Sequence, residues 1–195
     1  MRRQSEQIRH MTDREVLFHL YLTQALLLIV AGVVSFFLFD WTEWRQLWRF
    51  DLSDVLLYGV GAAALVLTAD FLAMRYLPED WHDDGGVNEK IFRNRSIPHL
   101  FFLCVLIAVT EEWLFRGIVQ THWGLWVASA IFAVLHVRYL EKWFLFFMVI
   151  LLSLFLGVLY ERTDSLWVTV IAHFLIDFVL ALHIRLSRET EEEEE

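Results

Sequence analysis

The chain has 195 residues, of which 57% are hydrophobic, a share above the roughly 45–50% that is usual in soluble domains. Its formal net charge of −9 comes mostly from a run of glutamates at the C-terminal end, and neither half carries the basic excess of a nucleic-acid-binding protein. The composition therefore excludes nucleic acid as an expected partner and favours an integral membrane protein.

Six apolar segments follow one another along the chain and predict an all-α fold, a polytopic membrane helix bundle of about six transmembrane helices. They are Val16–Phe39, Leu52–Met74, Ile97 to about Gln120, Gly124–Val137, Trp143–Tyr160 and Ser165 to about Leu186. The fourth is shorter than the ~20 residues that a spanning helix needs, although Trp123 and Tyr139 beside it suit a membrane interface.

The expected organisation is a cytoplasmic N-terminal segment over 1–15, one membrane-embedded domain over 16–188, and a disordered acidic tail over 189–195. The first apolar segment has no obvious small-residue cleavage site and is expected to be a retained anchor rather than a signal peptide. With the N-terminus inside, the internal segments hold 12 of the 16 lysines and arginines. This distribution predicts a multi-pass protein of the cell membrane with both termini in the cytoplasm.

Two connections between the apolar segments have distinct compositions. Trp41, Trp44 and Trp48 recur at helical spacing and predict a short helix lying at the membrane interface. The longest connection, 75–96, is rich in Asp and Gly and is expected to be a linker. Cys104 lies in an apolar stretch and is expected to be a buried packing thiol.

Ionisable residues inside the apolar segments form three short motifs. They are Glu111, Glu112 and Arg116 in the third segment, His136 in the fourth, and His173 and Asp177 in the sixth. A charge at the bilayer centre costs at least ~2.5–3.5 kcal/mol, so these side chains are expected to gather around a polar cavity. The spacing of four residues predicts an ion pair between Glu112 and Arg116, and a contact by which Asp177 orients His173.

Glu111 lies about 100° around the helix from Glu112 and is therefore able to act on a substrate or a water. Phe132 precedes His136 by four residues and is expected to pack beneath its ring. At ~1.5 Å per residue, Glu111 and His173 lie about 12 Å from the external ends of their segments, and His136 about 18 Å. A packing network of ion pairs is the structural alternative, but a second glutamate and two histidines at similar depth favour a functional site.

The strings Glu111-Glu112-x-x-x-Arg116, Phe132-x-x-x-His136 and His173-x-x-x-Asp177 resemble the three motifs of the CPBP family, also called the Abi family. These are bacterial relatives of the type II CAAX prenyl proteases, and the match covers Ile97 to Phe178. The resemblance implies an intramembrane peptidase, with Glu111 activating water and His136 and His173 completing the site. The family's third motif often ends in Asn; because an ionised Asp177 can only accept hydrogen bonds, it is expected to orient His173, which would donate to the oxyanion.

Two mechanisms fit these residues. In one, Glu111 is a metal-free general base and His173 stabilises the tetrahedral oxyanion. In the other, His136, His173 and a glutamate, with Glu112 the first candidate, bind one divalent metal ion such as zinc. The sequence leaves both open because it contains no His-Glu-x-x-His pair of ligands.

The expected partners are a membrane protein or peptide substrate and the lipid bilayer. Two other functions stay open. One is a non-proteolytic relative that acts as a membrane scaffold or immunity protein. The other is a transporter or proton relay, since buried carboxylates and histidines also form relays, although no inverted repeat is visible.

Overall fold

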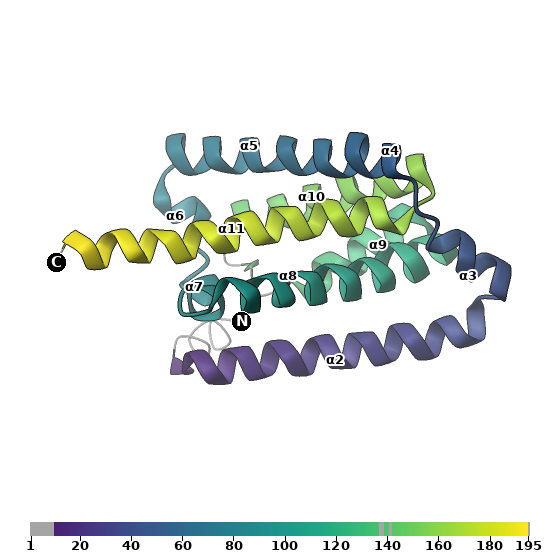
Figure 1. The fold of residues 1–195 in the computed structure, drawn as a ribbon, viewed down its shortest axis with the longest axis horizontal. Coiled ribbons are helices and arrows are strands. Elements are labelled where there is room, and N and C mark those ends of the chain that lie inside the picture. Colours follow the sequence, from purple (N-terminus) through teal and green to yellow (C-terminus); the bar gives the residue numbers. More distant parts are fainter. Residues whose placement is uncertain (1–9, 137–138, 141, 195) are drawn as a thin grey trace.

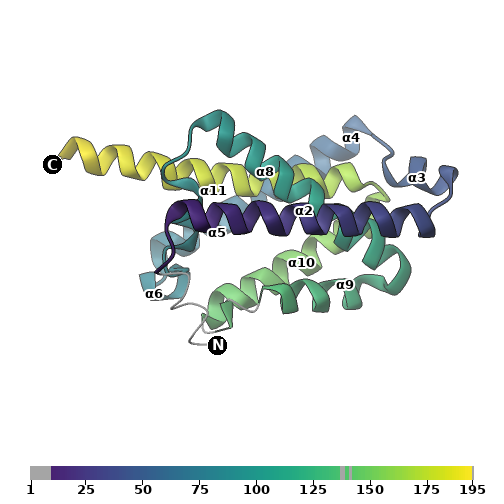
Figure 2. The same ribbon diagram turned by 90° about the horizontal axis from the view of Figure 1, so that it is seen from below.

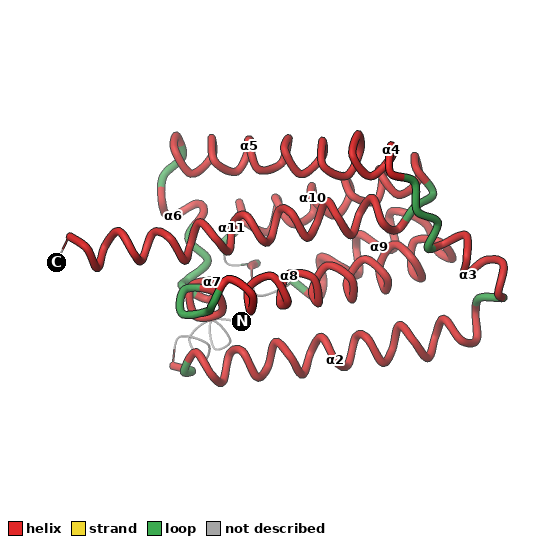
Figure 3. Tube along the Cα trace, in the orientation of Figure 1, coloured by secondary structure: helices red, strands yellow, loops and turns green. Residues whose placement is uncertain are grey.

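The computed structural model describes residues 10–136, 139–140 and 142–194, and this part of the chain contains helices and no strand. Figures 1 and 3 show the long helices running side by side along one direction. In chain order the elements are α2 (Asp13–Leu38), α3 (Trp41–Leu47), α4 (Leu52–Asp54), η1 (Val55–Val60), α5 (Gly61–Tyr76), α6 (Glu79–His82), α7 (Val87–Phe92), α8 (Ile97–Glu112), η2 (Trp113–Gln120), α9 (Thr121–Leu135), α10 (Trp143–Thr163) and α11 (Leu166–Glu194). The all-α membrane bundle predicted from the sequence is confirmed.

Four stretches of the described chain are long and apolar enough to span a membrane: Asp13–Leu38, Trp41–Tyr76, Trp143–Thr163 and Leu166–Ser187. The predicted third segment is also continuously helical, as α8 followed by η2, but it carries three charged residues. The predicted fourth segment corresponds to α9, which has 15 residues and is broken near its start by Gly124, at φ 84°. The number of six spans therefore stays a prediction, and Val137 lies outside the described residues.

Helix α11 lies at the centre of the bundle, where it packs against α5, α7, α8, α10 and η1. Figure 2, seen from below, shows α2 in front, with α9 and α10 to one side and α8 and α11 to the other. The N-terminal end of α2 is fixed by a capping box between Thr12 and Glu15. Helix α2 packs against α7, α8 and η2, so it can contribute side chains to the same interior.

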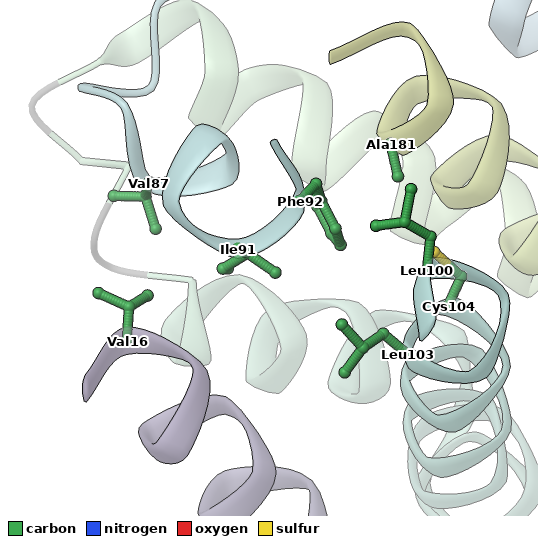
Figure 4. Close-up of a cluster of buried hydrophobic side chains, with 8 residues drawn as sticks. All are labelled: Val16, Val87, Ile91, Phe92, Leu100, Leu103, Cys104 and Ala181. Carbon is green, nitrogen blue, oxygen red and sulfur yellow. The ribbon is translucent and has the colours of Figure 1, made fainter. Parts of the chain in front are cut away.

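The connection expected to be a linker contains two short helices, α6 and α7, so that prediction is wrong in part. Asp84 accepts hydrogen bonds from the backbone of Gly86, Val87 and Asn88, which starts α7. Helix α7 then buries its apolar face in a cluster with residues of α2, α8 and α11 (Figure 4): Val16, Val87, Ile91, Phe92, Leu100, Leu103, Cys104 and Ala181. Cys104 is fully buried there as a packing thiol, as the sequence predicts.

Two further expectations concern the tryptophan-rich connection and the acidic tail. The tryptophan-rich connection forms the helix α3, as predicted, with an Asp40–Glu43 capping box at its start. Helix α11 ends at Glu194 and Glu195 lies outside the described residues, while the disordered tail expected over 189–195 stays a prediction.

Gly59 of η1 provides a test of the close packing on α11. A Cβ added at Gly59 would lie 3.1 Å from the carbonyl oxygen of Val168, whereas one added at Gly61 meets nothing within 4 Å. We expect Gly59→Ala to lower the free energy of unfolding by about 1–3 kcal/mol through overpacking. Gly61→Ala should be neutral or stabilising by up to ~1 kcal/mol, because alanine is the better helix former. Thermal unfolding in detergent compares the two; equal effects would contradict this packing.

Candidate active site

The junction of α8 and η2 places the first motif in the interior. Glu111 and Glu112 are the last two residues of α8, and Arg116 lies in η2, a π-helical stretch of eight residues. π-helical turns are rare and frequently occur at functional sites. Helix α11 runs alongside α8 and brings His173 and Asp177 to this junction.

Glu112 is the centre of a buried charge network and is fully excluded from the surface. Its Oε1 lies 2.9 Å from Nδ1 of His173, and its Oε2 lies 3.2 Å from Nε of Arg116. The ion pair predicted between Glu112 and Arg116 is confirmed. The contact between Glu112 and His173 was not predicted, since it joins helices 61 residues apart in the chain.

His173 lies between two carboxylates. Besides the contact of Nδ1 with Glu112, its Nε2 lies 3.4 Å from Oδ2 of Asp177. The predicted contact with Asp177 is therefore present, but Glu112 makes the shorter one. An ionised carboxylate only accepts hydrogen bonds, so the ring donates to both carboxylates when both of its nitrogens carry a proton.

Arg116 connects this network to α9 and α10. Its Nη2 donates to the carbonyl oxygen of Ser153 at 3.1 Å, and its guanidinium carbon lies 5.2 Å from the ring centroid of Phe132. The Phe132 ring in turn stacks on His136, with centroids 4.3 Å apart. The expectation that Phe132 packs against the His136 ring is confirmed, and a continuous series of contacts runs through all three motifs.

His136 is the C-cap residue that follows α9, and its orientation is fixed locally. Its Nδ1 lies 2.8 Å from the carbonyl oxygen of Phe132, and its ring also stacks on Tyr139. A carbonyl oxygen can only accept, so Nδ1 carries the proton and, in the neutral ring, Nε2 carries the lone pair.

Glu111 is partly exposed, unlike its buried neighbour Glu112. Its Oε1 accepts a hydrogen bond of 3.1 Å from Nε2 of Gln24, which α2 supplies. The two glutamates thus face different neighbours, as their angular separation predicts. Sequence reasoning missed Gln24, although a single amide in an otherwise apolar membrane segment is a signal that would have singled it out.

The proposed metal ligands do not form a metal-binding set in the described part of the chain. No group of three or more His, Cys, Asp or Glu residues there is arranged to hold a metal ion. The metal-dependent alternative, with His136, His173 and Glu112 as ligands, therefore stays a prediction.

Two comparisons with known proteins bear on this site. A family model described as type II CAAX prenyl endopeptidase Rce1-like matches residues 93–179, a region that contains all three motifs. The uncharacterized protein YpbD of Bacillus subtilis (strain 168) is 48% identical over 167 residues, which cover 85% of this chain and 88% of that protein. No solved structure was found to match the chain.

Proposed function

Because the chain belongs to the type II CAAX prenyl endopeptidase Rce1-like family, we propose that it is an intramembrane endopeptidase that hydrolyses a membrane-associated protein or peptide. One observation carries the proposal. The buried ion pair of Glu112 and Arg116 holds the His173 ring in place, while the adjacent Glu111 is partly exposed. A network that served packing alone would not account for this second glutamate.

Glu111 is the general base of the proposed reaction. Gln24 occupies its Oε1, and no hydrogen bond within the described residues occupies its Oε2, which can therefore bind a water. Glu111 takes a proton from this water as the water oxygen attacks the carbonyl carbon of the scissile peptide, and the π electron pair of the carbonyl moves to its oxygen. The same proton then passes to the leaving amine nitrogen as the C–N bond breaks and the carbonyl re-forms.

His173 is the proposed donor to the oxyanion. Its Nδ1 is tied to Glu112 at 2.9 Å, whereas its Nε2 lies 3.4 Å from Asp177, longer than the ~2.7–2.9 Å of a tight charge-assisted hydrogen bond. The proton on Nε2 is therefore the one that a developing oxyanion can attract. His136 is the second imidazole of the site, and its ring stacks on Phe132.

Asp177→Asn tests how His173 is oriented. Glu112 makes the shorter contact from a fully buried position, while the Asp177 side chain is 26% exposed. We therefore expect Asp177→Asn to change kcat by less than about tenfold, equivalent to ~1.4 kcal/mol in the activation barrier. Peptide turnover measures the effect, and a loss greater than a hundredfold would assign the orienting role to Asp177 instead.

The activity is tested with purified protein in liposomes. One probe is a farnesylated peptide ending in a CAAX sequence, chosen from the family's description, and the other is an unmodified transmembrane peptide. Mass spectrometry of the products, with and without a chelator, is expected to reveal a new C-terminus that depends on Glu111 and persists with chelator. Proton or solute flux across the same liposomes without cleavage would contradict the proposal and favour a transporter.

A further inference from the structure

Gln24 is an unusual residue for its position. It lies in the membrane-spanning helix α2, is only 2% exposed, and shares the buried face of that helix with Ala31 and Ser35. A buried amide lowers the free energy of unfolding unless both its donor and its acceptor are satisfied. Its Nε2 is satisfied by Glu111, to which it donates a hydrogen bond of 3.1 Å.

The second polar atom of this amide has no described partner. Within the described part of the chain, Oε1 of Gln24 is buried and accepts no hydrogen bond. Buried polar atoms of this kind commonly mark the place of a water molecule. The atom belongs to the same amide group that holds Glu111, so a water bound to it lies beside the Glu111 carboxylate.

We infer that Gln24 is a positioning residue for Glu111: its Nε2 holds one carboxylate oxygen, and its Oε1 accepts a hydrogen bond from the water that Glu111 deprotonates. This inference rests on the proposed function of Glu111. A water that donates one proton to Glu111 and the other to Gln24 has its lone pair directed away from both acceptors. Two acceptors therefore fix the direction of attack, which a carboxylate alone does not.

Helix α2 is accordingly part of the catalytic site. Among the ionisable groups on the elements around Glu111, Glu112, Arg116, His173 and Asp177 contact one another. Helices α2 and α8 also carry His19, Tyr21 and His99, and the Tyr21 hydroxyl lies 2.8 Å from Nε2 of His99. Gln24 is the described residue that holds Glu111 from outside this network. The three sequence motifs lie on α8, η2, α9 and α11, so they do not include this contribution.

The first test needs no substrate. Infrared difference spectra between wild type and Glu111→Gln in liposomes identify the carboxylate band of Glu111. Gln24→Met keeps the length and helical preference of the side chain but removes the amide, so this band is expected to shift. Ser35→Ala is the matched control on the same face of α2, because it removes only the acceptor of a hydrogen bond from Trp113. An unchanged band in Gln24→Met would overturn the inference.

Turnover of the farnesylated peptide tests the positioning role itself. We expect Gln24→Met to lower kcat at least about tenfold with KM changed less than about threefold, whereas Ser35→Ala keeps the wild-type kcat. Gln24→Glu keeps the shape and can donate to Glu111 only while it is protonated, so its kcat should fall with rising pH along a limb that wild type lacks. A Gln24→Glu profile parallel to wild type would contradict the inference.

The two proposals fail in different ways. If Glu111→Gln is inactive while Gln24→Met retains the wild-type kcat, Gln24 has no positioning role and the peptidase proposal stands. If Glu111→Gln remains fully active, Glu111 is not the base and both proposals fall. Loss of cleavage in Ser35→Ala equal to that in Gln24→Met would show that any defect on this face of α2 suffices, which overturns the specific role of Gln24.

Discussion

Glu111→Gln is expected to reduce peptide cleavage at least about a hundredfold, because general-base catalysis typically contributes 10²–10⁴-fold. Glutamine has nearly the shape of glutamate but cannot take a proton from water. Glu111 is partly exposed and lies outside the ion pairs of Glu112, so the bundle should fold without it. Cleavage rates and thermal unfolding, measured on the same preparation, separate loss of chemistry from loss of structure.

The control for this variant is Glu89→Gln, which makes the same chemical change on the exposed part of α7. The side chain of Glu89 is 59% exposed and lies 3.8 Å from Arg93. Its replacement should leave the cleavage rate within about twofold of wild type, since exposed ion pairs contribute little. Wild-type activity in Glu111→Gln would remove Glu111 from the reaction and with it the proposed mechanism.

Arg116→Leu is expected to cause the largest loss of stability, about 3–5 kcal/mol, because it leaves the charge of Glu112 buried without its neighbouring guanidinium. Both side chains are almost completely inaccessible, at 1% and 0% relative exposure. The loss should appear as a much lower unfolding temperature in detergent or as protein that does not accumulate in the membrane.

A double variant shows whether the stability lost in Arg116→Leu is due to a charge left without its partner or to lost packing. Arg116→Leu combined with Glu112→Leu removes both charges, so it should be more stable than Arg116→Leu alone, although it loses the contact with His173. Lys142→Ala provides the exposed comparison: it breaks the 3.0 Å pair with Asp83 and should cost less than ~1 kcal/mol. If the double variant is the least stable of the set, the charges themselves are not the cause.

The sequence predicted the features that depend on local spacing. Hydropathy located the long helices, and the four-residue interval between Glu112 and Arg116 was sufficient to predict their ion pair, because both lie on one helical stretch. Contacts between helices depend on how the helices rotate and slide against one another. The bond from His173 to Glu112 and the bond from Gln24 to Glu111 could therefore not be predicted from spacing within either segment.

The two short helices in the connection 75–96 were not predicted, for a related reason. Helices α6 and α7 have 4 and 6 residues, far below the ~12–15 at which an isolated helix becomes stable in water. Helix α7 is stabilised by burying Val87, Ile91 and Phe92 against distant parts of the chain. Local composition, dominated by Asp83, Asp84 and the two glycines that follow, predicts a turn, and the structure also has a turn at those residues.

The buried network also constrains when the stretch 97–120 can enter the membrane during synthesis. The stretch 97–120 leaves the ribosome with three charged side chains, but His173, which contacts Glu112, is synthesised 61 residues later. Until then this stretch is a poor candidate for release into lipid by the translocon, because its charges are only partly neutralised. We expect it to be retained beside the insertion machinery until α11 arrives, so that nascent chains truncated before α11 fail to integrate it stably.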